Sequence, residues 1–274
     1  MFSCSKMKFL TPFLCLIILV HSNAFSQKES PYNFNWKKDL GYSAGAGLVL
    51  AGGLVATSQM RPLTAAQVGS LDPFELSGID RTAISKWNPA AATSSDAFLY
   101  ASFALPGLMM INKRARKDFL VVGFIYAEVG MITLGLTELS KAGFHRVRPY
   151  AYNPDVDIDF KTTKGARQSF FSGHTAMTAA LCFTTAKVFS DYSDNPTHEA
   201  LVWTGAAIFP IVTASLRYAA GRHFPSDVIT GYFIGGAIGY LVPWLHRRKP
   251  LAKGLTISPV GLQNGAGIYL SYRL

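Results

Sequence analysis

The chain has 274 residues, of which 49% are hydrophobic and only 15% are charged, and its formal net charge is +10 at pH 7. In soluble domains about a quarter of the residues are charged, so this composition favours a helical protein in or on a membrane. The cations are scattered through apolar sequence rather than gathered on one polar element. We therefore expect no nucleic-acid partner, and the charge suits anionic lipids or a phosphorylated substrate.

The N-terminus has the pattern of a secretory signal peptide, predicted over residues 1–26. Two lysines precede the apolar run 9–20, small residues follow at 24–26, and cleavage is expected before Gln27. An uncleaved membrane anchor is the alternative for this segment. After cleavage Cys182 would be the one cysteine left, which excludes an intrachain disulfide.

Six further apolar segments follow in chain order, and several approach the ~20 residues that cross a bilayer. They predict an all-α, membrane-associated bundle of about six helices. The glycine-rich first segment is the weakest candidate for a membrane span. The polar stretch 61–96, with Asp72-Pro73 and Asn88-Pro89 as breakers, predicts a long loop with a short helix. The six segments lie at about 40–60, 97–112, 118–140, 170–189, 200–220 and 226–246.

The last segment, 250–274, changes character. Two stretches alternate apolar and polar residues, and Asn264-Gly265 between them is a hairpin signal, so a short C-terminal β-hairpin tail is expected. The predicted domain layout is the signal at 1–26, an N-terminal helix and loop region at 27–95, a catalytic helical domain at 96–249, and this tail.

Three short motifs, within 141–149, 172–174 and 217–227, each adjoin the end of an apolar segment. Together they supply three fixed cations, two histidines and one carboxylate. Phosphoryl transfer needs such a set of side chains, because cations must hold the equatorial oxygens while a nucleophile attacks in line and an acid protonates the leaving group. The candidate side chains and backbone positions are Lys141, Arg148, Ser172, Gly173, His174, Arg217, His223 and Asp227.

The order and spacing of the motifs resemble the type-2 phosphatidic acid phosphatase and vanadium haloperoxidase superfamily. Its signature is Lys, six residues, Arg-Pro; then Pro-Ser-Gly-His; then Ser-Arg, five residues, His, three residues, Asp. Phe171 stands where proline is usual, and Leu216 separates Ser215 from Arg217. No charged or proton-carrying residue is lost, so we expect the chemistry to survive. The resemblance covers roughly residues 96–249.

The resemblance implies that His223 is the nucleophile, through a phosphohistidine intermediate, and that His174 is the general acid and later the base that activates water. Pro225 favours a helix start, which puts Asp227 in the first turn, where its carboxylate can accept the proton on one ring nitrogen of His223. Ser172 predicts an N-cap whose following N–H groups point at an anion, Gly173 among them.

The motif cations Lys141, Arg148 and Arg217 are expected to hold phosphate oxygens, the arginines through paired donors. His145, Arg146 and Arg222 are extra cations near the site, which could meet a second phosphate or lipid headgroups; we interpret them as solvated edge charges. Asp155, Asp157 and Asp159 alternate in one loop, which suggests a Ca²⁺ or Mg²⁺ site or equally a half-exposed strand. We expect no metal and no cofactor.

Basic clusters at 113–117 and 246–249 predict cytoplasmic loops, so the motifs should face the periplasm at the bacterial inner membrane. A cleaved signal conflicts with this orientation if every segment crosses; the alternative is a periplasmic protein that rests on the membrane. The predicted function is a metal-independent phosphatase of a lipid phosphate or polyprenyl pyrophosphate. A vanadate-dependent haloperoxidase and a non-catalytic membrane scaffold or lipid-binding protein are the alternatives. The oligomeric state is open.

Overall fold

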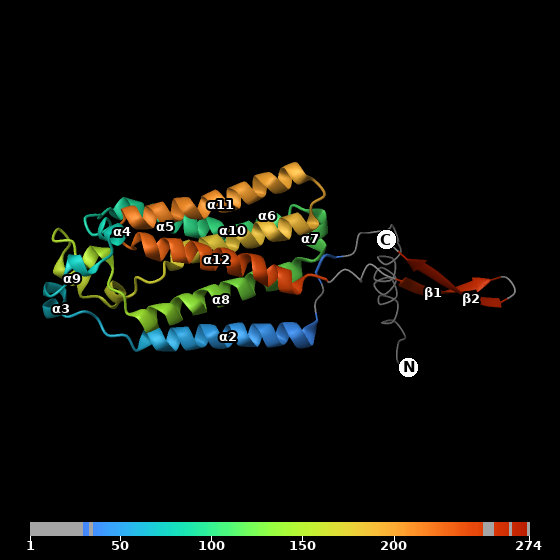
Figure 1. Ribbon diagram of the computed structural model, residues 1–274, viewed down its shortest axis with the longest axis horizontal. Coiled ribbons are helices and arrows are strands. Elements are labelled where there is room, and N and C mark those ends of the chain that lie inside the picture. Colours follow the sequence, from blue (N-terminus) through green and yellow to red (C-terminus); the bar gives the residue numbers. More distant parts are fainter. Residues whose placement is uncertain (1–29, 33–34, 249–254, 263–264, 273–274) are drawn as a thin grey trace, which may run out of the picture. The chain divides into compact units, whose positions relative to one another are not determined.

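The computed structural model describes residues 30–32, 35–248, 255–262 and 265–272, so the predicted signal at 1–26 lies outside the described residues. The described chain is mostly helical, which confirms the helical fold class (Figure 1). The described helices of 14 residues or more are α2 (Trp36–Ser58), α5 (Pro89–Ser102), α8 (Phe119–Phe144), α10 (Gly173–Tyr192), α11 (Pro196–Ala219) and α12 (Pro225–His246).

The stretch 61–96 is not one long loop, because several short helices and the first half of α5 lie in it. Asn88-Pro89, interpreted above as a breaker, starts α5 instead: the Asn88 side chain accepts from the Ala91 N–H at 3.0 Å, and proline takes the first helical position. The described short helices are α3 (Ala65–Gly69), η2 (Pro73–Glu75), α4 (Gly78–Arg81), α6 (Leu105–Met109), α7 (Lys113–Lys117), η3 (Pro149–Ala151), α9 (Ile158–Lys161) and η4 (Lys164–Arg167).

The C-terminal segment contains strands β1 (Leu255–Leu262) and β2 (Gly265–Tyr272), paired antiparallel with Leu255 opposite Tyr272. The turn signal at Asn264 falls outside the described residues. The predicted hairpin tail, and any packing of it on the helices, therefore stay a prediction.

Helix α10 is the central element of the bundle and packs against α5, α8, α11 and α12. Its contact with α12 is close because glycines of α12 face it. A Cβ at Gly235 would stand 2.0 Å from the carbonyl oxygen of Ala176, and one at Gly239 would stand 2.3 Å from that of Ala180. Small residues at this spacing let two helix backbones approach, so α12 holds the start of α10 firmly.

Four described helical segments are long and apolar enough to cross a membrane: Trp36–Ser58, Phe119–Ala151, Pro196–Ala219 and Pro225–His246. The glycine-rich first segment, expected to be the weakest candidate, is thus among the candidate spans by length and composition. Helix α10 does not meet this criterion, because it is rich in threonine. Its neighbours enclose it, so its side chains face other helices rather than lipid. The four apolar helices support a membrane protein.

The helices place all three motifs at one end of the bundle. At the motif end, the Ser172 N–H donates to the carbonyl oxygen of Asp227 at 3.1 Å, which joins the start of α10 to that of α12. At the opposite, basic end, the Arg248 N–H donates to the carbonyl oxygen of Pro31 at 2.9 Å, and Arg114 of α7 donates to the carbonyl of Tyr192 at 3.0 Å. Figure 1 shows the two ends, with α3, α4 and α9 at one and α7 at the other.

Candidate active site

The loops that carry the motifs are joined by backbone hydrogen bonds. The Arg148 N–H donates to the Ala166 carbonyl at 2.8 Å, and the Tyr150 N–H donates to that of Gly221 at 3.1 Å. Gly221 has φ +68, and a Cβ there would stand 2.0 Å from the carbonyl oxygen of Lys86. Only glycine fits this left-handed turn, which directs the chain from α11 into the loop of His223.

His223 is almost completely buried, at 1% exposure, and its ring orientation is set by the backbone. Nδ1 lies 2.8 Å from the carbonyl oxygen of Ser169. A carbonyl can only accept, so Nδ1 carries the proton and the Nε2 lone pair is left for a reaction. Burial, followed by the charges of Arg148 and Arg217, holds the pKa of His223 well below its usual value, so the ring is neutral at physiological pH.

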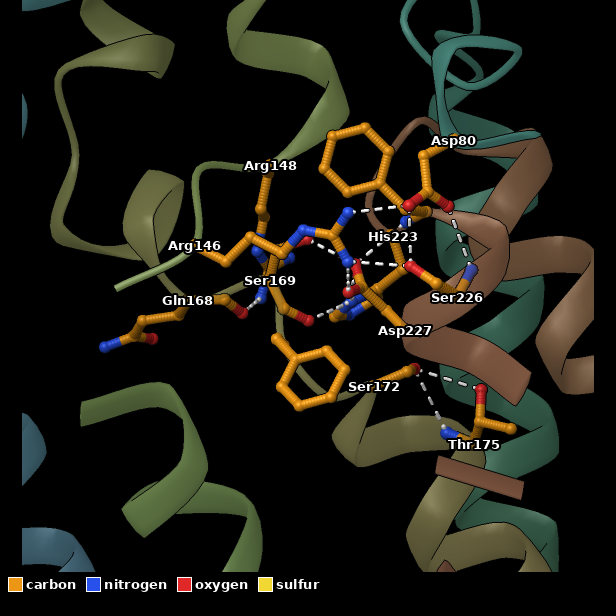
Figure 2. A network of polar contacts seen from close by, with 12 residues as sticks. Asp80, Arg146, Arg148, Gln168, Ser169, Ser172, Thr175, His223, Ser226 and Asp227 are labelled. Carbon is orange, nitrogen blue, oxygen red and sulfur yellow. Dashed lines mark hydrogen bonds and ion pairs between the residues drawn. The ribbon is translucent and has the colours of Figure 1, made fainter. Parts of the chain in front are cut away.

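Asp227 does not orient His223 as predicted, because its Oδ2 lies 3.7 Å from Nδ1, beyond hydrogen-bonding distance. This oxygen instead accepts from the Ser169 hydroxyl at 2.5 Å and from the Phe224 N–H at 2.9 Å. Asp227 therefore acts one step away: it holds the residue whose carbonyl fixes the imidazole (Figure 2).

Arg146 is not the solvated edge charge that the sequence suggested. Its guanidinium donates to Asp227 at 2.6 Å, to Ser226 at 2.7 Å and to Asp80 of α4 at 2.7 Å, and it lies 4.3 Å from the ring centroid of Phe224 (Figure 2). Burial tends to raise the pKa of Asp80, but hydrogen bonds from Ser226 and Arg146 outweigh it and lower that pKa. The cluster is thus an ionic network beneath the His223 loop, in which both carboxylates are buried and the Arg146 side chain is 25% exposed.

His174 lies in the first turn of α10 and has a partner that sequence reasoning missed. Its Nε2 donates to Oδ1 of Asp96 on α5 at 2.8 Å, and the same oxygen is 3.6 Å from Nη1 of Arg217. Burial and the charge of Arg217 lower the pKa of His174 to about 4, while Asp96 opposes this shift. A lone carboxylate at the start of an apolar segment was the available signal, since such residues are usually functional.

The three motif cations lie beside these histidines. Nζ of Lys141 pairs with Glu138 at 2.6 Å, and a Cβ at Gly173 would come within 3.8 Å of Nζ, which places this cation against the Ser-Gly-His turn. Arg148 donates to the carbonyl of Gln168 at 3.2 Å, and Arg217 donates to the hydroxyl of Ser95 at 3.1 Å.

Both motif arginines keep unused donors. In the part of the chain that the structure describes, the buried Nε atoms of Arg148 and Arg217 have no hydrogen-bond partner. Buried donors are rarely left unpaired, so each orphan donor is suited to a ligand. Ser172 caps α10, accepting from the Thr175 N–H at 3.4 Å, and the first N–H groups of any helix lack an intrahelical partner. The site is therefore built to receive an anion.

Within the described ranges, no group of three or more His, Cys, Asp or Glu side chains is arranged to hold a metal ion. The half-exposed strand considered for 155–159 is wrong: the segment turns and enters α9, with Asp157 at the helix start. His145 was grouped with Arg146 and Arg222 as an extra cation near the site. It is the left-handed C-cap of α8, at φ 47, and it is exposed.

The comparisons with known proteins support the family resemblance. The model of the PAP2 superfamily matches residues 118–250. A lipid A 4'-phosphatase from Porphyromonas gingivalis is 27% identical over 145 residues, covering 52% of this chain and 57% of that protein. An undecaprenyl-diphosphatase from Sulfolobus acidocaldarius is 28% identical over 157 residues, covering 56% and 68%. The chain thus spans little more than half the length of the first of these relatives.

Two solved structures are also similar. One is a transmembrane PAP2 type phosphatidylglycerolphosphate phosphatase from Bacillus subtilis, at 19% identity and TM-score 0.45, covering 76% of this chain and 95% of that one. The other is Aquifex aeolicus LpxE, at 24% identity and TM-score 0.40, covering 60% and 92%. Residues 118–250 of this chain, just under half of its length, thus match the PAP2 superfamily.

Proposed function

We propose that the protein is a phosphatase that removes phosphate from a lipid phosphate or a polyprenyl diphosphate through a phosphohistidine on His223. The observation that carries this proposal is the state of His223, a buried neutral imidazole with Nδ1 held by Ser169 and Nε2 free. It lies beside Arg148 and Arg217, whose charges suit a phosphoryl group. The lipid phosphatases among the relatives support the same substrate class.

In the proposed reaction, Lys141, Arg148 and Arg217 hold the equatorial oxygens while Nε2 of His223 attacks phosphorus. The bond from phosphorus to the leaving oxygen breaks, and imidazolium His174 gives that oxygen its proton. Water then attacks the phosphohistidine, loses a proton to His174, and releases inorganic phosphate and the free imidazole of His223.

The pKa of His174 in the empty site suits this cycle. At about 4, the ring is mostly neutral at pH 7, because burial and the charge of Arg217 disfavour the proton. A bound phosphate dianion offsets Arg217 and Arg148, so the pKa rises when substrate enters. Asp96, hydrogen-bonded to the ring at 2.8 Å, stabilises the same protonated form. His174 therefore becomes an acid where an anion is present to be cleaved.

An apolar groove beside the third motif supports a lipid substrate. It lies between α11 and α12, has a volume of about 500 Å³, and includes Tyr218 next to Arg217 and Val228 next to Asp227. Both helices are candidate membrane spans. A hydrocarbon chain lying in this groove from the bilayer side would leave its phosphate at the motif end.

We also propose that the motif end faces the periplasm at the inner membrane. The basic clusters of α7 and of 246–248 lie at the opposite end, and basic loops are retained in the cytoplasm. Helix α2 also begins at that end, so this orientation places its start in the cytoplasm. A cleaved signal would instead leave the start of α2 outside.

Single cysteines that replace the exposed residues Asp159 and Thr197, in a Cys-free background, distinguish the two orientations. We expect an impermeant maleimide to label Asp159→Cys alone in spheroplasts; labelling of Thr197→Cys alone would reverse the orientation, and labelling of both would indicate a membrane-resting protein.

The test of the function is phosphate release from lipid monophosphates and diphosphates by the purified protein in detergent, with and without excess EDTA. We expect release that persists in EDTA, is inhibited by vanadate as a transition-state mimic, and is lost in His223→Ala. Release that requires Mg²⁺, or that survives in His223→Ala, would contradict the proposal. Halide oxidation in the presence of vanadate would instead indicate the haloperoxidase.

A further inference from the structure

Arg222, the residue before His223, is held in an aromatic cage. Its guanidinium carbon lies 4.7 Å from the ring centroid of Phe160 and 5.4 Å from those of both Trp87 and Tyr150. Arginine stacks favourably on aromatic faces, and three rings restrict the side chain to one place. The sequence interpretation of Arg222 as a solvated edge charge therefore missed these three rings.

The cage positions the guanidinium without neutralising it. Among the described residues, the Arg222 guanidinium has no hydrogen bond and no carboxylate contact besides the three rings, and the side chain is half-buried. Arg146, which contacts the third motif, has its donors taken up by Asp80, Ser226 and Asp227. Arg222 thus keeps planar N–H donors that are fixed in place and open to solvent.

This free cation stands beside the proposed site. The Arg222 N–H donates to the carbonyl of Arg217 at 3.1 Å, and Tyr150 of the cage follows Arg148-Pro149 of the first motif. Its charge acts on both Arg148 and Arg217. In the proposed reaction three cations already hold the phosphoryl group in transfer, so a fourth beside them is suited to a neighbouring anionic group.

We propose that Arg222 binds a second phosphoryl group attached to the one being transferred, so that the site favours diphosphate esters over monoesters. This inference rests on the proposed function for its catalytic consequence, but the anion selectivity can be measured without turnover. The leaving group would then be the inner phosphate of the diphosphate, with its charge held by the caged guanidinium while the terminal phosphoryl group moves to His223. A purely structural cage would affect both ester classes alike.

The experiment compares the wild type with Arg222→Gln and Arg222→Lys, and uses Arg116→Gln at an exposed position of α7 as the matched control. Protection against thermal unfolding by inorganic pyrophosphate and by inorganic phosphate gives the two affinities, and kcat/KM is measured for a monophosphate and a diphosphate of one isoprenoid chain. We expect Arg222→Gln to lose about tenfold more affinity for pyrophosphate than for phosphate, because a charge-assisted contact is removed. Its kcat/KM should likewise fall about tenfold more for the isoprenoid diphosphate than for the monophosphate. Lysine should restore part of this loss.

Equal losses for both anions, or no loss of pyrophosphate affinity, would overturn the role of Arg222 and assign the cage to structure or to lipid headgroups. A third outcome separates the two proposals. If the wild type prefers pyrophosphate, if Arg222→Gln loses this preference, and if the protein releases no phosphate from any lipid, the anion site stands and the phosphatase activity is rejected. The thermal midpoints without ligand show whether each variant is folded.

Discussion

Replacing Asp96 by asparagine tests whether this carboxylate supports the proton on His174. The carboxylate oxygen lies 2.8 Å from Nε2 of His174, and asparagine keeps the shape but removes the charge. A nearby opposite charge shifts a pKa by about 1–3 units, and because the Asp96 side chain is 44% exposed we take the lower end. Asp96 raises the pKa of His174, so its removal lowers that pKa by about one unit.

The expected result is a change in the pH profile rather than a uniform loss. With less of the acid protonated, the alkaline limb of kcat moves about one pH unit lower, and kcat on that limb falls about tenfold. KM for the anionic substrate should fall, because Arg217 loses a carboxylate 3.6 Å away that competes with phosphate.

The assay measures kcat and KM from pH 4 to 9 on a lipid phosphate and on an aryl phosphate, whose better leaving group needs less protonation. The aryl phosphate should be less affected. An unchanged alkaline limb, a limb that moves to higher pH, or an equal loss on both substrates would refute the role of Asp96. In a His174→Ala background the same substitution should add little further loss, because the group on which it acts is absent.

Two further predictions concern the nucleophile and the ionic network. His223→Ala should abolish turnover, whereas His174→Ala should still phosphorylate His223 slowly from an aryl phosphate; equal loss of the burst of released alcohol in both variants would contradict this division of roles. Arg146→Ala leaves two buried carboxylates without their cation and should destabilise the protein by about 3–5 kcal/mol, measured by unfolding in detergent. The exposed Arg116→Ala should change stability by less than about 0.5 kcal/mol, and a similar small effect for Arg146→Ala would refute the buried network.

The parts of this protein that could be predicted are those carried by local sequence. Apolar segments of helical length mark the long helices, and motif spacing identifies residues such as Lys141, Arg148 and His223 as neighbours of helix ends. The structure brings these ends together because the helices alternate in direction through the bundle. Their catalytic and binding roles are proposals that the experiments above address.

The partners of the motif residues could not be predicted, because they come from distant segments. Asp80 and Asp96 lie in the stretch interpreted as a loop, 66 residues from Arg146 and 78 from His174. No spacing rule connects such pairs in one sequence. For the same reason Arg146 and Arg222 were interpreted as solvated charges. The sequence of a loop does not show whether its cation contacts water, carboxylates or aromatic rings.

With these partners, the proposed site extends beyond the segment that matches the family. The match begins at residue 118, after α5. Before it, Asp80 neutralises Arg146 under the His223 loop, Asp96 engages His174 and Arg217, and Trp87 stacks on Arg222. The family core therefore supplies the groups that would touch phosphate, while the preceding helices set their charge and position. Substitutions in α4 and α5 are therefore expected to change the charge and position of these groups without any change in the three motifs.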